Sequence, residues 1–373
     1  MKVVFAGGGT GGHVFPIVAI AREMKKRIPP NAELIYIGPR DDYSKDTLSQ
    51  EGIKTHFILS GKLRRYFSIP DFFSSLVDIF FKVPAGIVQA LSLIFFIAPD
   101  LIFSKGGYGS IPVVIAGWLL GVPVFLHESD IVPGLANKLL SKFSSEIFVS
   151  FPVKETEYFP LKKMIQVGNP IRKELLEGSS EKAKELFKLK KEKPVILVLG
   201  GSQGSQRINE LMMEILPELL GKFEIIHQTG AKDFPKIQKE VVAFIPEALR
   251  DNYHPLAFLS EEELKHAYSI ADCVISRAGS GTIFELAALK KPSVLIPLPE
   301  SAQNHQVKNA YAYSRYNACL VLEEGNLSPH FFLEKLNNLF LYNYLQEMKL
   351  GAEKFAKPNA SDVIARYLLE FLE

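Results

Sequence analysis

The sequence predicts an α/β protein with two Rossmann-like domains, each built on a doubly wound parallel sheet, that face each other across a cleft. The chain has 373 residues, which is too long for one ordinary domain. Short apolar segments rich in β-branched residues alternate with longer helical patterns, as in parallel sheets with helices on both faces. Four of these apolar segments run directly into glycine-rich sequence that opens a helix.

The composition is that of a folded, soluble protein. Apolar residues make up 47% of the chain and charged residues 23%. Cys273 and Cys319 have no metal-like or redox-like spacing, which favours a reducing compartment. The chain begins with an expected strand and not with a basic, then apolar, cleavable segment, so we expect no secretory signal. The net charge of +2 gives no reason to expect a nucleic-acid partner.

The expected strands follow one another with helical sequence between them. Because consecutive strands are separated by helices, the connections should be right-handed crossovers. In the first half the strands are Val3–Ala6, Leu34–Ile37, Leu101–Phe103, Val122–Leu126 and Ile147–Val149. In the second half they are Val195–Leu199, Phe223–Gln228, Cys273–Ile275 and Val294–Ile296.

The domains should join at residues 167–170, with sequence VGNP. Gly168 can adopt backbone angles that suit a hinge, and Pro170 disfavours helix at Asn169. The tail predicts helices interrupted near Pro358. We therefore expect a first domain over 1–167, a second over 168–345, and a C-terminal helical segment over 346–373.

The glycine-rich segments are the strongest functional signal. They are GGGTGGH at 7–13, KGGYGS at 105–110, GGSQGS at 200–205 and RAGSGT at 277–282, two in each half. A glycine turn before a helix brings backbone N–H groups close to an anion, and the helix dipole favours negative charge there. One such loop often serves strand–helix packing alone. Four of them at the carboxyl ends of strands predict a ligand that carries phosphate groups.

His13 begins the helix after the first loop, with Pro16 in the first turn. The positive end of the helix dipole disfavours protonation of the imidazole. A neutral imidazole suits a general base near pH 7. A helix-capping histidine bonded to a carboxylate or phosphate explains the position equally well.

Several acidic and polar residues also follow expected strands. Glu128 can orient a base or bind sugar hydroxyls, or it can cap the next turn. Glu285 lies early in the helix after the fourth loop, where a carboxylate can accept two hydrogen bonds from a ribose diol or simply complement the helix dipole. Polar side chains that suit sugar hydroxyls, or a solvated loop, occur at 303–306. No metal-ligand set is visible, so we expect helix ends to stabilise any diphosphate.

Residues 67–99 are unusually apolar. The clean run from Val83 to Ala98 falls short of the ~20 residues that span a bilayer, and we expect it to be a buried helix. Basic residues precede an aromatic-rich part, which suits peripheral contact with anionic lipid. The expected contacts are Arg64, Arg65, Phe67, Phe72 and Phe73.

Six motifs in this order resemble one enzyme family over almost the whole chain. They are GGGTGGHVFP at 7–16, GGY at 106–108, HE at 127–128, GNPIR at 168–172, GGSQGS at 200–205 and RAGSGTIFELA at 277–287. The family adds N-acetylglucosamine to undecaprenyl-pyrophosphoryl-N-acetylmuramyl-pentapeptide. The resemblance implies the two-domain GT-B fold, with the C-terminal helix packed back on the first domain.

The resemblance also implies roles for individual residues. His13 is the usual candidate for the base, with Glu128 as a second catalytic residue. Loops one and two would hold the acceptor diphosphate through Gly9, Gly106, Gly107 and Tyr108. Donor contacts would come from Thr10, Gly11, Gly12, Asp130, Arg172, Ser202, Leu259, Ser280, Gly281, Thr282, Ile283, Phe284, Glu285 and Gln306. Within this set the Leu259 backbone would bind uracil, Glu285 the ribose and Gln306 the sugar.

Two departures from the family pattern concern donor binding. The chain has HESD at 127–130 where the family commonly has HEQN, so Asp130 replaces an asparagine. The segment near Leu259 is also longer than in the family, which affects the uracil assignment.

The resemblance implies an inverting transfer from UDP-N-acetylglucosamine, without a cofactor or metal, at the cytoplasmic face of the cell membrane. The partners are then the nucleotide sugar, the lipid-linked acceptor and an anionic membrane surface. One alternative is a dinucleotide-dependent oxidoreductase, because Gly7, Gly9 and Gly12 match its fingerprint, but Gly38–Arg40 lacks the expected acid. Another GT-B transferase, a nucleotide-sugar epimerase and a non-catalytic nucleotide sensor remain as further alternatives.

Overall fold

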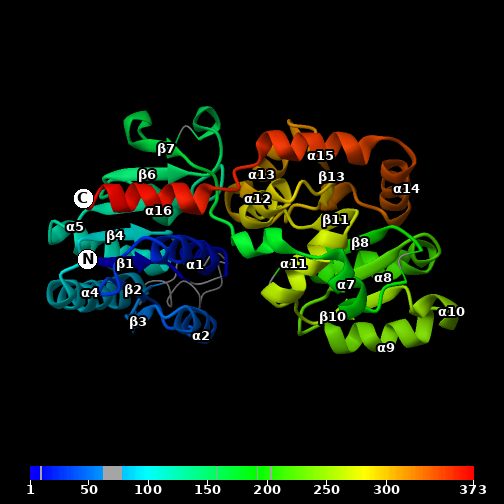
Figure 1. The fold of residues 1–373 in the computed structure, drawn as a ribbon, viewed down its shortest axis with the longest axis horizontal. Coiled ribbons are helices and arrows are strands. Elements are labelled where there is room, and N and C mark those ends of the chain that lie inside the picture. The colour runs from blue at the N-terminus through cyan, green and yellow to red at the C-terminus, as the bar shows by residue number, and fades with distance from the viewer. Residues whose placement is uncertain (9–10, 62–77, 157, 191, 202–203) are drawn as a thin grey trace. The chain divides into compact units, whose positions relative to one another are not determined.

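A computed structural model describes residues 1–373 except 9–10, 62–77, 157, 191 and 202–203. The chain forms two compact units, and each contains its own sheet (Figure 1). The first unit is Met1–Arg172 with Asn359–Glu373, and the second is Lys173–Pro358. The first division therefore falls after Arg172, beyond the 167–170 segment that the sequence suggests. Hydrogen bonds from His127 to Gly168 and from Ser129 to Asn169 keep that segment on the first sheet.

The first unit contains a seven-stranded parallel sheet in the order β3-β2-β1-β4-β5-β6-β7. Its strands are β1 Lys2–Ala6, β2 Glu33–Gly38, β3 Lys54–Phe57, β4 Leu101–Ser104, β5 Val124–Glu128, β6 Glu146–Val149 and β7 Met164–Gln166. Its helices of six or more residues are α1 Gly11–Lys25, α2 Asp42–Gln50, α4 Val83–Ile97, α5 Ile111–Leu119, α6 Leu135–Leu140 and α16 Ala360–Glu370. Alternate side chains of β1 enter two separate cores, Val3 and Phe5 on one face and Val4 and Ala6 on the other.

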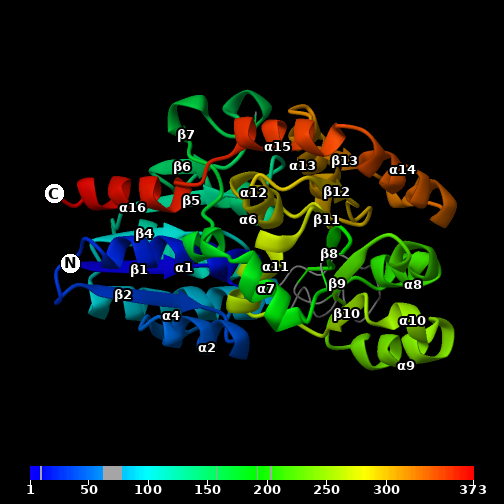
Figure 2. The same cartoon turned by 45° about the vertical axis from the view of Figure 1, so that its right-hand side comes forward.

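Helix α16 completes the core on the face that α1 covers. Ile364, Ala365 and Leu368 are buried there with the β1 side chains, and Arg27 of α1 pairs with Asp362 of α16. Figures 1 and 2 show α16 beside α1 on this sheet. The preceding helix, α15 (Tyr344–Phe355), belongs to the second unit, where it packs against α12. Only the part of the 346–373 segment from Asn359 onward therefore lies in the first unit.

The expectation that Val83–Ala98 is a buried helix is wrong. In α4 only the narrow stripe of Gly86, Ala90 and Ile94 is buried. The small stripe lets α4 pack closely on its surroundings, since a Cβ at Gly86 would lie 1.9 Å from the Leu59 carbonyl oxygen. Large apolar side chains point to solvent instead, among them Phe95 at 67% and Phe96 at 79% exposure. Together with the π-helical turn η1 (Asp78–Lys82), α4 forms a 20-residue helical segment that is long and apolar enough to cross a membrane.

The second unit repeats the topology with a six-stranded parallel sheet in the order β10-β9-β8-β11-β12-β13. Its strands are β8 Val195–Leu199, β9 Glu224–Gln228, β10 Tyr253–Leu256, β11 Cys273–Ser276, β12 Ser293–Leu295 and β13 Cys319–Val321. Its helices are α7 Ser180–Phe187, α8 Gln206–Leu220, α9 Phe234–Phe244, α10 Glu247–Arg250, α11 Glu261–Ile270, α12 Ser280–Ala288, α13 His305–Ser314, α14 Pro329–Leu341 and α15. The segment between α15 and α16 contains Pro358, where the sequence predicts an interruption of the helices.

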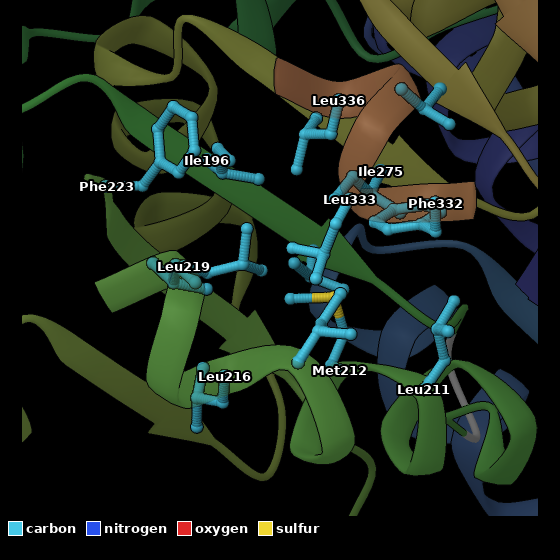
Figure 3. Packing of buried hydrophobic residues seen from close by; sticks show 14 of the residues in the cluster. Ile196, Leu211, Met212, Leu216, Leu219, Phe223, Ile275, Phe332, Leu333 and Leu336 are labelled. Carbon is cyan, nitrogen blue, oxygen red and sulfur yellow. The ribbon is translucent and has the colours of Figure 1, made fainter. Parts of the chain in front are cut away.

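A hydrophobic core of the second unit lies between the sheet and the helices α8 and α14. Figure 3 shows Ile196 and Ile275 of the sheet facing Met212 of α8 and Phe332 of α14. Each of these four side chains is 0% exposed. This packing fixes where β8 and β11 end, and therefore where their loops begin.

The four glycine loops occupy equivalent places in the two sheets. In each sheet the strand order reverses next to the first strand of the unit, between β1 and β4 and between β8 and β11. The strands at this switch point end at the same level, because Ala6 pairs with Ser104 and Leu199 pairs with Ser276. Loops one and two follow β1 and β4, and loops three and four follow β8 and β11. Doubly wound sheets bind their ligands at this position.

Candidate active site

Loops one and two of the first unit are held close together. Gly8, Gly106 and Gly107 have φ angles of 118°, 86° and 82°, in the left-handed region where glycine is favoured. The buried Tyr36 hydroxyl donates to the Gly7 carbonyl at 2.7 Å and anchors loop one. Of the first loop, Gly9 and Thr10 lie outside the described residues, and Gly11 and Gly12 form the first positions of α1. Loop two continues into the short helix Tyr108–Ser110.

His13 lies at the start of α1, against the backbone of loop two. A Cβ at Gly107 would come within 3.0 Å of His13 Nε2, so the imidazole edge and this loop are neighbours. Burial, followed by the nearby Lys105 charge, lowers the His13 pKa to about 4. The imidazole is therefore neutral near pH 7 and able to accept a proton.

Lys105 lies in the same part of the site. It begins the second glycine-rich segment, but the motif predicts no role for its side chain. Its side chain is 2% exposed, and its ammonium group donates to the Ser129 hydroxyl. Burial lowers the Lys105 pKa to about 8, while Glu128 and Asp130 oppose this shift. A buried cation beside two carboxylates compensates part of their charge.

Glu128 acts in the structure as the cap of the turn that follows β5. Its Oε1 accepts the Asp130 backbone N–H at 2.9 Å, and its Oε2 accepts Asn137 Nδ2 at 2.8 Å. Burial, and then the Asp130 charge, raises the Glu128 pKa to about 7. Of the three roles that the sequence leaves open, this geometry corresponds to turn capping. Asp130 is partly exposed at the end of the capped turn.

His127 and Arg172 are two further buried side chains near the first unit's site. The His127 Nε2 atom lies 3.1 Å from the Gly168 carbonyl and donates to it in the neutral form. Burial, and then Lys105, holds the His127 pKa well below its usual value. Arg172 is buried, and its guanidinium lies 4.0 Å from the centre of the Phe15 ring. Arg172 therefore packs within the first unit.

Loop three begins the second unit's site and is anchored by a buried amide that sequence inspection missed. Gly201 and Gly204 have φ angles of 88° and 79°, while Ser202 and Gln203 lie outside the described residues. Gln228, at the end of β9, donates through Nε2 to the Gly201 carbonyl at 2.8 Å. Its Oε1 accepts the Leu259 backbone N–H at 3.1 Å. One side chain therefore links loop three to the segment that the resemblance assigns to uracil.

The Leu259 contact narrows what this residue can offer a base. The side chain is 2% exposed, and the N–H is already bonded to Gln228. The backbone carbonyl therefore remains as the group suited to a ring N–H, which uracil presents at N3. Helix α11 starts directly afterwards, with a capping box between Ser260 and Glu263 that fixes the direction of the chain.

Arg277 ties loop three to loop four. Its Nε and Nη2 donate to the Ser205 hydroxyl at 3.1 and 2.8 Å, and its Nη1 donates to the Ile296 carbonyl at 3.1 Å. It also pairs with Glu324, which in turn pairs with Arg207. Because these contacts come from three strand ends, they fix both loops against the sheet.

The start of α12 presents backbone donors. Gly279 is the N-cap and supplies no side-chain capping bond. Helical bonding begins at Ile283, which donates to the Gly279 carbonyl at 3.0 Å. The N–H groups of Ser280, Gly281 and Thr282 therefore have no partner within the helix and suit an anion. The side chains of Ile283 and Phe284 are buried in the core, so they do not take part in such binding.

Glu285 and Gln306 complete the described part of the second site. Glu285 is partly exposed on α12, and its Oε2 accepts the hydroxyl of Tyr268 at 3.1 Å. Gln306 accepts the Leu298 N–H at 2.9 Å, which fixes its amide at the start of α13. Directly before α13, Gln303 and Asn304 have φ angles of 53° and 55°, which are rare for residues other than glycine. Such strained backbone is concentrated at functional sites.

Among the described residues no group of three or more His, Cys, Asp or Glu side chains could hold a metal ion. Residues 3–149 match the glycosyltransferase family 28 N-terminal domain, and residues 195–364 match the glycosyltransferase family 28 C-terminal domain. The chain belongs to glycosyltransferase family 28. Its enzyme class is therefore that of a glycosyltransferase, as the motifs predict, and not that of an oxidoreductase.

Relatives of this family 28 enzyme match it over the full length. It is 40% identical over 98% of both chains to the UDP-N-acetylglucosamine–N-acetylmuramyl-(pentapeptide) pyrophosphoryl-undecaprenol N-acetylglucosamine transferase of Clostridium tetani. It is 38% identical over 99% of both chains to a transferase of the same name, numbered 2, from Bacillus cereus.

Solved structures confirm the two-domain GT-B architecture of the family 28 chain. It is similar to MurG of Acinetobacter baumannii, with a TM-score of 0.74 and 26% identity over 99% of both chains. It also resembles the UDP-GlcNAc 2-epimerase of Neisseria meningitidis, with a TM-score of 0.69 and coverage of 99% and 100% of the two chains. At 17% identity, the latter similarity shows the fold alone.

Proposed function

We propose that this glycosyltransferase moves N-acetylglucosamine from UDP-N-acetylglucosamine to the 4-hydroxyl of undecaprenyl-pyrophosphoryl-N-acetylmuramyl-pentapeptide. The transfer inverts the anomeric carbon and belongs to peptidoglycan synthesis. The observation that carries the proposal is the match at 40% identity, over 98% of both chains, to a transferase named for this reaction. The paired glycine loops support it, because donor and acceptor each contain a diphosphate.

The second unit binds the donor in this proposal. The N–H groups at the start of α12 and the backbone of loop three hold the diphosphate, and their partial positive charge stabilises the departing UDP. The Leu259 carbonyl accepts the uracil N3–H, and Glu285 accepts the ribose hydroxyls. Gln306, positioned by its bond to Leu298, binds the sugar.

The first unit binds the acceptor and handles the proton. Loops one and two hold the acceptor diphosphate through backbone N–H groups. His13 accepts the proton of the 4-hydroxyl while the oxygen attacks the anomeric carbon. The bond from that carbon to the diphosphate breaks, and its electron pair leaves with UDP. Burial, and then the nearby Lys105 charge, lowers the His13 pKa and keeps the imidazole neutral before the reaction.

The test is transfer of labelled N-acetylglucosamine by the full chain to a lipid-linked muramyl-pentapeptide diphosphate. We expect a labelled disaccharide lipid with inverted configuration at the new bond, and no transfer to the acceptor lacking its diphosphate. Other UDP-hexoses serve as donor controls. Efficient transfer from another UDP-hexose, or release of free sugar without an acceptor, would rule out the proposed reaction.

We also propose that the first unit contacts the cytoplasmic face of the cell membrane peripherally. The exposed apolar face of η1 and α4 supports this, because monomeric soluble proteins rarely expose contiguous apolar surface of this kind. Its members with the largest exposure are Phe80, Phe81, Val88, Phe95 and Phe96. The predicted contacts Arg64, Arg65, Phe67, Phe72 and Phe73 precede this face in the chain but lie outside the described residues.

Sedimentation with lipid vesicles tests the membrane proposal. The chain should bind vesicles containing anionic phosphatidylglycerol more tightly than neutral phosphatidylcholine vesicles. Exchanging both Phe95 and Phe96 for Ser should weaken binding about tenfold or more, since each lost aromatic contact removes apolar burial. Phe244→Ser is the matched control, because Phe244 is 73% exposed in the second unit. Equal loss in both variants would exclude α4 as the specific contact.

A further inference from the structure

Tyr268 is a buried residue with a hydroxyl group aimed at the expected ribose site. It lies near the end of α11, is 1% exposed, and donates to Glu285 Oε2 at 3.1 Å. A buried phenol needs a hydrogen-bond partner, and an ionised carboxylate is a strong one. The neighbouring sequence offers no motif for this contact, since Tyr268 and Glu285 belong to different helices.

The bond restricts the rotation of the Glu285 carboxylate and occupies only part of its capacity to accept hydrogen bonds. A carboxylate offers about four acceptor positions, of which Tyr268 occupies one. Glu285 is partly exposed, so its carboxylate can also meet a ligand. A side chain held by a hydrogen bond loses less freedom when it binds, and it presents its oxygens in one direction.

Helix α11 also connects two parts of the donor site. Its N-cap, Ser260, directly follows Leu259, and its side chain and that of Glu263 form a capping box. Tyr268 lies at the other end of the same helix. The position of the uracil-binding backbone and the orientation of Glu285 are therefore set by one rigid element.

We propose that Tyr268 is a positioning residue that fixes Glu285 for the vicinal diol of the donor's ribose, and so makes the enzyme select ribonucleotides over 2′-deoxyribonucleotides. The inference rests on the proposed binding of the nucleotide sugar to the second unit. Two hydroxyl groups can bind a correctly oriented carboxylate together, whereas a 2′-deoxyribose offers only one. A carboxylate that rotates freely loses much of this difference.

The test compares UDP with 2′-deoxy-UDP as competitive inhibitors of the full-length enzyme. The native chain should bind UDP more tightly, and Tyr268→Phe should reduce this preference about fivefold, the worth of roughly one hydrogen bond. The KM for UDP-N-acetylglucosamine should rise by a similar factor, while kcat at saturation stays within about twofold because the reacting atoms are untouched. Glu285→Gln should also reduce the preference, and adding Tyr268→Phe to it should have little further effect.

Tyr253→Phe is the matched control. Tyr253 is also buried in the second unit, and its hydroxyl lies 2.8 Å from His227 Nδ1. His227 is not among the groups proposed to bind the ligand. Its loss should lower the melting temperature without changing the preference for UDP. If Tyr253→Phe changes the preference as much as Tyr268→Phe does, Tyr268 acts only through stability.

The remaining outcomes distinguish failure of the proposed ribose site from failure of the positioning role of Tyr268. If the native enzyme binds both nucleotides equally, or Glu285→Gln leaves the preference intact, the ribose assignment in the proposed function is wrong. If the preference depends on Glu285 but not on Tyr268, only the positioning role is overturned.

Discussion

The two units place glycine loops at the same switch point of the same topology but support them with different chemistry. In the first unit the supporting side chains are ionisable groups, the partly exposed His13 and the buried Lys105 and Glu128, and loss of solvent is the largest cause of each pKa shift. In the second, the Gln228 amide and the Ser205 hydroxyl hold the loops, with Arg277 paired to Glu324. The difference fits the proposed division of roles, in which the first unit binds the acceptor and accepts the proton while the second unit binds the donor.

The largest effect should come from His13. We expect His13→Gln to lower kcat about 10²–10⁴-fold, the usual contribution of a positioned general base, with the donor KM changed little. Steady-state transfer kinetics with both substrates saturating measure this. His330→Gln, at an exposed position, is the control. A variant of His13 with native turnover would remove proton transfer from this residue.

The second prediction concerns acid stability, where the two units should behave alike. His127 and His227 are buried, and burial lowers the pKa of both, that of His227 to about 3. Their folded pKa lies below the unfolded value of ~6.5, so their stabilising effect is complete above that pH and is lost as the pH falls. Each should cost about 2 kcal/mol of unfolding free energy at pH 5 relative to pH 7.

The single tryptophan makes this measurable for one unit at a time. Trp118 lies in α5 of the first unit, so its fluorescence follows unfolding of that unit by urea. His127→Gln should flatten the pH dependence of this transition, while His227→Gln should leave it unchanged and alter the transition of the second unit seen by circular dichroism. His13, with a pKa of about 4, should retain part of the acid sensitivity of the first unit. A transition independent of pH between 7 and 5 would contradict the buried neutral state.

The third prediction concerns the link between loop three and Leu259. Gln228→Met removes both hydrogen bonds while keeping a side chain of similar size, and we expect the donor KM to rise about tenfold with kcat nearly unchanged. UDP titration calorimetry should show the same loss. Gln238→Met, at an exposed site on α9, should change neither. A fall in kcat at constant KM would instead assign Gln228 to the chemical step.

The sequence predicted the central strands and missed the edge strands. All nine expected strands exist, and the four that were missed, β3, β7, β10 and β13, are the two edges of each sheet. Central parallel strands are covered on both faces and form continuous apolar runs, whereas edge strands are short and more polar. Strand β10 even contains Pro255, which a central strand would not tolerate.

The site could be predicted only where its residues are local in sequence. Glycine turns and helix starts occupy a few consecutive positions, so the loops and the position of His13 follow from spacing. Gln228 and Tyr268 act through partners distant in the chain, and no local pattern marks them. Lys105 begins the second glycine-rich segment, but its bond to Ser129 follows only from the fold. The burial of α4 was misjudged for a related reason, since its composition is apolar on all sides and only packing shows that a narrow stripe is covered.

The smallest effect should come from Asp130, where the chain departs from the family pattern. Burial is the largest cause of the raised Glu128 pKa, and the Asp130 charge is the second. The same charge opposes the lowering of the Lys105 pKa, so Asp130 makes the electrostatic potential of this part of the first unit more negative. Because the resemblance assigns this position to donor contact, Asp130→Asn should lower the donor KM about two- to fivefold by removing repulsion between like charges. Because partly exposed charges are screened, the gain should shrink as salt rises from about 0.05 to 0.5 M. Asp46→Asn, at an exposed position on α2, is the control and should leave the donor KM unchanged.

A higher donor KM in Asp130→Asn would mean that the carboxylate accepts a hydrogen bond from the donor. Asp130 would then take part in donor binding from the first unit, and the contrast between a unit that handles the proton and a unit that binds the donor would be less sharp than the loops suggest.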